Sequence, residues 1–139
     1  MGARVDLHLR QPNGTVLSTT ALLNGGFEAA DPHVLLPRRA YQHLFPQDPV
    51  GVYEEQVQTA GGTDTVAVVP GAVEAWVHGG DRSSVVVGVK VLVSDAESEV
   101  LVSDTAIDAF GIEIKSHGQG LWRFNDEERV RPSVPHQLW

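Results

Sequence analysis

One short segment of this sequence joins a tight turn to a polar side chain that can hold water. Asn24-Gly25-Gly26 follows directly on an apolar run. Asparagine and glycine tolerate a positive φ, so the triplet predicts a sharp reversal of the chain. The asparagine amide can hydrogen-bond a water molecule, but it has no group that titrates near neutral pH and cannot take a proton from that water. The nearest carboxylates along the chain belong to Glu28 and Asp31.

A second apolar segment, residues 100–102, runs into Ser103-Asp104 in the same manner. Serine and aspartate are both good N-cap residues, so either can begin the helix that we expect to continue through Phe110. Gly111 then stands at the C′ position, where glycine is favoured. Because capping already accounts for Asp104, we do not assign it a catalytic role.

Taken in order, these features resemble the retroviral-type (retropepsin-like) aspartic protease family, including its single-domain microbial members. In that family an apolar run ends in Asp-Thr/Ser-Gly, a Leu-Pro pair opens a short helix, a hairpin forms a flap, and an apolar-apolar-Gly segment precedes the last helix. The similarity spans 7–124, with Leu36-Pro37 and the hairpin glycines Gly61 and Gly62 in the corresponding places. The resemblance implies a closed β-barrel with two short helices. It also implies a homodimer, because one chain supplies one copy of a motif that the family's cleft needs twice.

Carried over by position, Asn24 stands where the family has its catalytic aspartate, Gly25 where it has Thr or Ser, and Gly26 where it has the motif glycine. In the family two aspartates share a proton and polarise a water molecule between them, because like charges about 3 Å apart cannot both ionise. Asn24 cannot play that part, and Gly25 lacks the hydroxyl that connects the two catalytic loops. The resemblance therefore implies an inactive cleft.

The same alignment implies which residues would contact a substrate. These are Glu28 beside the turn, Gly61 and Gly62 at the flap tip, and Ser103 in place of the second motif's glycine. Glu28 or Asp31 could substitute for the missing acid. We favour a solvated loop, or a contact to the backbone of a bound peptide, for both.

Three functions remain open at this point. The first is an inactive, homodimeric protease-like protein that keeps a cleft for a peptide or protein ligand, or serves as a dimer scaffold. The second is an active aspartic endopeptidase, in which Asn24 becomes aspartate by deamidation or stands where an aspartate was deliberately changed. The third is a β-barrel interaction module unrelated to proteases, in which Asn24-Gly25-Gly26 is an ordinary turn.

Other chemistries find little support in the residues. The six histidines show no spacing typical of a metal site, and no serine lies in a G-x-S-x-G segment. The glycines at 79–80 and 118–120 precede no helix that could hold a phosphate. We therefore expect neither a metal nor a cofactor.

Apolar residues recur mostly with a period of two, which predicts strands and a mainly β domain over 1–125 with a tail at 126–139. Trp76 and Trp122 are expected in the core, while Trp139 either anchors the tail to its own domain or to a partner, or is disordered. Short helices are expected over 37–45 and 104–110. The expected strands are 4–10, 16–23, 34–36, 53–59, 65–69, 72–77, 84–93, 100–102, 112–114 and 121–124.

Length and charge bound the remaining function classes. The chain has 139 residues and no cysteine, which fits one domain without disulfides. Its formal net charge is −8 and its basic residues form no cluster, so nucleic acid is a poor partner. Its apolar stretches are far shorter than the ~20 residues of a membrane span, and no signal peptide is recognised. We expect a soluble, cytoplasmic protein without nucleic-acid or membrane partners.

Overall fold

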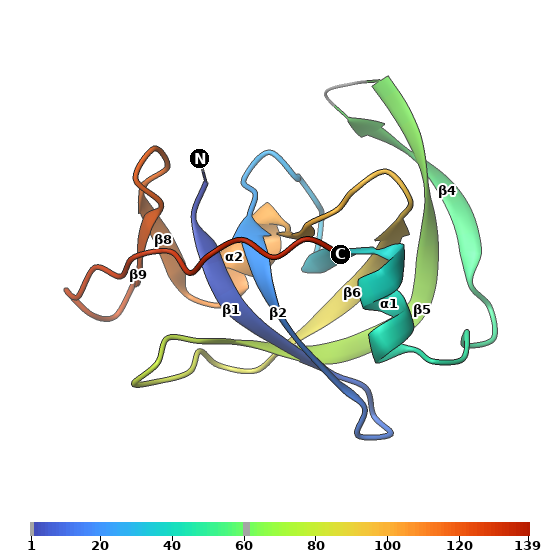
Figure 1. Ribbon diagram of the computed structural model, residues 1–139, viewed down its shortest axis with the longest axis horizontal. Helices are drawn as coiled ribbons and strands as arrows, with labels where there is room; N and C mark the ends of the chain where they lie inside the picture. Colours follow the sequence, from blue (N-terminus) through green and yellow to red (C-terminus); the bar gives the residue numbers. More distant parts are fainter. Residues whose placement is uncertain (1, 60–61) are drawn as a thin grey trace.

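The computed structural model of the chain describes residues 2–59 and 62–139. Six strands pair in the order β1-β2-β7-β3-β6-β5, and β5 pairs in turn with β1, so the sheet closes into a barrel (Figure 1). The expected mainly β barrel with two short helices is thus confirmed. The strands of the barrel are β1 (Arg4–Arg10), β2 (Val16–Leu23), β3 (His33–Pro37), β5 (Gly62–His78), β6 (Val87–Ser94) and β7 (Val100–Val102).

Alternation along the strands decides which side chains fill the barrel. On β1, Val5, Leu7 and Leu9 are fully buried, whereas the intervening Asp6 and His8 are half-buried on the other face. This is the period-two pattern of a sheet with one face on a core. The antiparallel β1–β2 pairing runs from Arg4 opposite Leu22 to Arg10 opposite Val16, as the predicted hairpin requires.

Two helices cover the barrel. Helix α1 (Arg38–Leu44) contacts β2, β3 and β6, and helix α2 (Asp104–Ala109) contacts β3, β6 and β8. Pro37 is the last residue of β3 and the N-cap of α1, so it precedes the helix and does not occupy its first position as expected. Among the described residues, no helix is long and apolar enough to cross a membrane.

Strand β5 is longer than the sequence indicated. Pro70-Gly71 was expected to separate two strands, but β5 continues through both residues, and its register with β6 shifts between Val69 and Val73. A bulge of this kind leaves its residues outside the ladder, so the missing N–H of proline costs nothing there. The N-terminal half of β5 therefore forms a hairpin with β4 (Tyr53–Thr59), and its C-terminal half closes the barrel against β1.

Strands β8 (Ile112–Ser116) and β9 (Leu121–Phe124) correspond to the last two segments that were expected as strands. They pair with each other as a two-stranded sheet beside the barrel, and Trp122 of β9 also pairs with Arg131 of the tail. Trp122 of this sheet is buried as expected. Trp76 is not a core residue: it is half-buried, and its ring stacks on His8 with the ring centroids 5.5 Å apart.

The tail packs on its own barrel. Arg131 and Trp122 exchange two backbone hydrogen bonds of 2.6 and 3.0 Å, and the Val134 N–H donates to the Arg4 carbonyl. From there the chain crosses β1 and β2 (Figure 1). The Trp139 ring at its end lies against the ring of His43 on helix α1. Of the three alternatives for Trp139, the structure thus shows an anchor to the chain's own domain.

Candidate functional site

Parallel pairing of β2 with β7 brings the two apolar runs of the sequence side by side. Leu23 lies opposite Val102, so Asn24 and Ser103 leave the sheet at the same end. The Asn24 N–H donates to the Val102 carbonyl at 3.0 Å. The structure therefore joins the two segments that the sequence analysis singled out, although about eighty residues separate them in the chain.

The turn after β2 uses the Asn24 side chain within itself. The Asn24 carboxamide oxygen accepts a 3.1 Å hydrogen bond from the Gly26 N–H, and the Asn24 backbone carbonyl accepts one of 3.0 Å from the Phe27 N–H. Asn24 is half-buried, while Gly25 and Gly26 are exposed. A Cβ atom at Gly25 would meet nothing within 4 Å, so this position has room for a side chain, whereas one at Gly26 would meet the Asn24 oxygen at 3.3 Å.

Ser103 is fully buried, and internal partners use its hydroxyl. The oxygen accepts from the His33 N–H at 3.0 Å and from the Ala106 N–H at 3.2 Å, and it lies 3.3 Å from the Thr105 hydroxyl. Ser103, and not Asp104, is therefore the N-cap of α2. In this structure Ser103 positions α2 against β3 and presents no free hydroxyl to a substrate.

Asp104 connects the first turn to α2. Its backbone N–H donates to the Phe27 carbonyl at 3.0 Å, and its carboxylate accepts from the Ala29 N–H at 3.0 Å and from the Thr105 N–H at 2.7 Å. The chain after Asn24 is thus held on the first turn of the helix by hydrogen bonds from both the backbone and the side chain of one residue.

The two loop carboxylates differ in their surroundings. Asp31 lies 2.7 Å from the Lys90 ammonium and 3.4 Å from His33 Nδ1, and the hydrogen bond with Lys90 lowers the pKa of Asp31 below its ordinary value. Asp31 is therefore a charged ion-pair partner and not an acid that holds a proton. Glu28 is exposed, and no described residue forms a hydrogen bond or ion pair with it.

Of the two hairpin glycines, Gly62 lies among the described residues. Gly62 begins β5 opposite Thr59, is exposed, and has a φ of +123°, which favours glycine. Gly61 lies outside the described residues. The rest of the hairpin is described, and β4 is the last strand of the sheet order.

A group of apolar side chains between the turn and this hairpin was not anticipated. We call it the outer apolar cluster, because Leu35 alternates with the core residues Val34 and Leu36 and so faces outward from the barrel. Leu101, Leu35, Leu92 and Val68 are successive cross-strand partners on β7, β3, β6 and β5. The cluster consists of buried Leu35, Val66 and Leu92 with partly buried Phe27, Val57, Val68 and Leu101.

The sequence did carry a signal for this cluster. Residues 34–36 and 100–102 are uniformly apolar, a pattern typical of strands that are covered on both faces. What covers the outer face here is Phe27, directly after the turn, and Val57 of the hairpin. The candidate site thus comprises a polar turn, an adjoining apolar surface and a hairpin beside it.

Comparison of the sequence with known proteins assigns no family to this chain. No protein-family model matches the sequence, and no curated protein matches it significantly. Among the described residues, no three histidine, aspartate or glutamate side chains are grouped so as to hold a metal ion.

Proposed function

We propose that this chain is a retropepsin-like protein that has lost catalysis and binds an extended peptide as a homodimer. The observation that carries the proposal is the place of Asn24. Pairing of β2 with β7 sets it beside the second motif at Ser103, and the outer apolar cluster begins three residues later at Phe27. A protease of this family needs a carboxylate at that place, and this chain has a neutral carboxamide.

Among the described residues, the carboxylates nearest the turn are either engaged by a partner or, in the case of Glu28, exposed to solvent on the loop. Cleavage requires one carboxylate to take a proton from water and a second group to donate one. Asn24 accepts a hydrogen bond from Gly26 and cannot ionise, Asp31 is paired with Lys90, and Asp104 holds the backbone of Ala29. Loss of catalysis with retention of the fold is therefore the function that the chemistry favours.

Two features support binding of an extended peptide. Strand β4 is an edge strand, so one side of its backbone is free to pair with an added strand. The outer apolar cluster leaves Phe27, Val57, Val68 and Leu101 partly exposed for apolar side chains of that peptide. Backbone pairing provides affinity, and the apolar surface provides selectivity.

The proposed dimer rests on the presence of a single Asn24 turn in each chain, whereas the family's cleft needs two such turns. One chain presents one exposed Gly25-Gly26 turn, and a two-fold axis through it would bring a second copy of Asn24 into the same cleft. The partner copy would then complete the site.

Incubation with a broad peptide mixture at acidic pH tests the loss of catalysis. We expect no cleavage by the unmodified protein while intact-mass analysis shows Asn24 still as the amide. Asn24→Asp restores one carboxylate per chain, and Asn13→Asp is the matched control, because Asn13 also precedes a glycine and accepts a hydrogen bond from Thr15 N–H. Cleavage by protein with an intact Asn24 amide would contradict the proposal, and cleavage that appears only as the amide is lost would favour the active peptidase.

Binding and assembly need separate measurements. Immobilised wild-type protein should retain peptides from the same mixture, and the immobilised Phe27→Ala variant should not retain them. Sedimentation equilibrium of the wild type should show a dimer. A monomer at high concentration, or a dimer with its two Asn24 side chains far apart, would contradict the retropepsin-like dimer. Either result would favour the β-barrel interaction module unrelated to proteases.

A further inference from the structure

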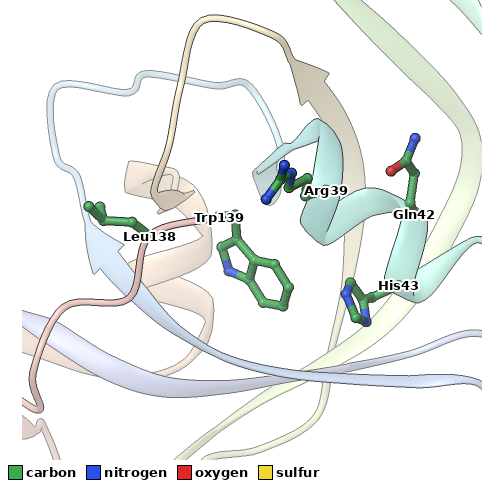
Figure 2. A pocket seen from close by; sticks show the side chains of 5 residues that line it. All are labelled: Arg39, Gln42, His43, Leu138 and Trp139. Carbon is green, nitrogen blue, oxygen red and sulfur yellow. The ribbon is translucent and has the colours of Figure 1, made fainter.

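A cavity of about 540 Å³ lies between helix α1 and the C-terminal segment. It is lined by Arg39, Gln42 and His43 from the helix and by Leu138 and Trp139 from the tail (Figure 2). The three helix residues are spaced i, i+3 and i+4, so they share one face of α1. The volume is that of a small-molecule site, but the pocket is open to solvent, because four of its five lining residues are exposed and Trp139 is half-buried. None of the candidate residues around Asn24 contributes to it.

The aromatic wall of this cavity is held in place. The Trp139 indole N–H donates to the Thr19 hydroxyl at 3.0 Å, and the Trp139 backbone N–H donates to the Ser98 carbonyl at 2.8 Å. Its ring lies 5.0 Å from the His43 ring, centroid to centroid. A half-buried indole fixed by two hydrogen bonds offers a flat apolar surface that need not be ordered when a ligand binds.

The charge of the cavity sets it apart from the rest of the molecule. The chain has ten Lys and Arg residues, and within the described part nine of them form ion pairs with carboxylates, whereas Arg39 forms none. No acidic side chain lines the cavity, and Arg39 forms no ion pair with the α-carboxylate of Trp139, the anionic group on a lining residue. In a protein with a net charge of −8, this guanidinium is therefore available to an external anion. The nine paired residues are Arg4, Arg10, Arg38, Arg82, Lys90, Lys115, Arg123, Arg129 and Arg131.

We propose that this cavity binds a small organic carboxylate with an aromatic or branched aliphatic body. The planar guanidinium of Arg39 matches a carboxylate with two parallel hydrogen bonds. The Trp139 ring and Leu138 are apolar surfaces for the body of the ligand. This site is independent of the proposed function at Asn24.

Titration of the full chain, labelled with ¹⁵N, with 3-phenylpropionate tests the proposal. The chain has three tryptophans, and Trp139→Phe identifies the Trp139 indole signal. We expect a saturable shift of that signal and of the α1 amides, while the indole signals of Trp76 and Trp122 stay in place. The uncharged analogue 3-phenylpropanamide should bind about tenfold more weakly, since it loses the charge-assisted hydrogen bonds.

Two variants separate the Arg39 contact from a general effect of charge. Arg39→Gln should weaken binding of 3-phenylpropionate about tenfold. Arg38→Gln removes the same charge from the same helix, but Arg38 is paired with Asp95 and does not line the cavity, so binding should be retained. Equal affinity for acid and amide, equal effects of the two variants, or no saturable shift of the Trp139 signal would each overturn the proposal.

Discussion

Single side chains set the chemistry of the turn at the end of β2. Asn24 lies where β2 meets β7, and its carboxamide oxygen accepts a hydrogen bond from Gly26 as an aspartate oxygen also would. An amide and a carboxylate have nearly the same shape, so the turn can keep its geometry while its ability to exchange protons changes completely. The fold therefore does not depend on the acid at this position.

Ser103 should be a structural residue of this region. Replacing it with alanine removes the N-cap of α2 and leaves the His33 N–H without its acceptor, which we expect to lower the free energy of unfolding by about 1–2 kcal/mol. Urea denaturation measures the loss. Ser98→Ala is the control, because Ser98 is exposed and contributes its backbone carbonyl to Trp139. Equal losses in the two variants would argue against this role.

Asp81 should contribute to stability at moderate pH. Its hydrogen bond with the buried Arg131 lowers the pKa of Asp81 from 3.8 to about 2. A lowered carboxyl pKa stabilises the folded state above the unfolded pKa, and this stabilisation is lost as the pH falls through the folded pKa. Asp81→Asn should thus lose less stability than the wild type between about pH 4 and pH 2.

Urea midpoints across this pH range provide the test of Asp81. Asp64→Asn is the control, because Asp64 is an exposed residue of β5 and no described residue forms an ion pair with it. The urea midpoint of the Asp64→Asn control should fall with decreasing pH as that of the wild type does. A profile of Asp81→Asn that also follows the wild type would show that the ion pair with Arg131 has no such effect.

At the scale of elements, the bend in β5 lets one strand serve two structures. Its N-terminal half belongs to the hairpin with β4, and its C-terminal half closes the barrel against β1. Alternation of apolar residues predicted both halves. It did not predict their continuity, because Pro70-Gly71 is also typical of a chain reversal, and only the pairing with β6 on both sides of the bulge joins the halves.

The bulge should depend on Gly71. This residue has a φ of +83°, and a Cβ there would meet nothing within 4 Å, so any cost of a side chain is conformational and not steric contact with a neighbour. Gly71→Ala should lower the free energy of unfolding by about 1 kcal/mol. Gly88→Ala on β6 also meets nothing within 4 Å and has no positive φ, so it should be neutral within about 0.5 kcal/mol or slightly stabilising. Thermal denaturation of both variants should separate them, and an equal response would contradict the argument.

For the molecule as a whole, the tail connects elements that are distant in the chain. It pairs with β9 through Arg131, contacts β1 through Val134, and ends on β2 and α1 through Trp139. Composition predicted a tail at 126–139, because this segment is charged and then contains prolines. The contacts place this tail against the barrel, and Leu138 and Trp139 form one wall of the cavity beside Arg39.

Neighbouring residues at the end of the tail allow a sharp test of this attachment. Trp139→Ala removes a half-buried ring and its hydrogen bond to Thr19, so we expect a loss of about 1–2 kcal/mol in the free energy of unfolding. Leu138 is 62% exposed, and Leu138→Ala should change stability by less than about 0.5 kcal/mol. Urea denaturation distinguishes the two. A tail that contributes nothing would leave both variants like the wild type.

The sequence by itself determined the features that depend on neighbours in the chain. The β1–β2 hairpin, the cap alternatives at Ser103-Asp104 and the C′ glycine Gly111 follow from local propensity and alternation, and the structure has each of them. The turn at Asn24 is also present, but none of its three residues has the positive φ on which the prediction was based. It also determined that Asn24 cannot ionise, because this is a property of the residue type.

Only the tertiary structure decided which distant residues meet. Closure of the barrel by β1 and β5, the outward-facing row through Leu35 and Leu101, and the separate β8–β9 sheet depend on strand pairing that local pattern leaves open. The same holds for Arg39: its charge is evident in the sequence, but only the fold shows that the other basic side chains have carboxylate partners and that Trp139 lies beside it. Strand pairing and burial bring together groups that are far apart along the chain. They therefore depend on the whole folded molecule, and no single segment of the sequence determines them.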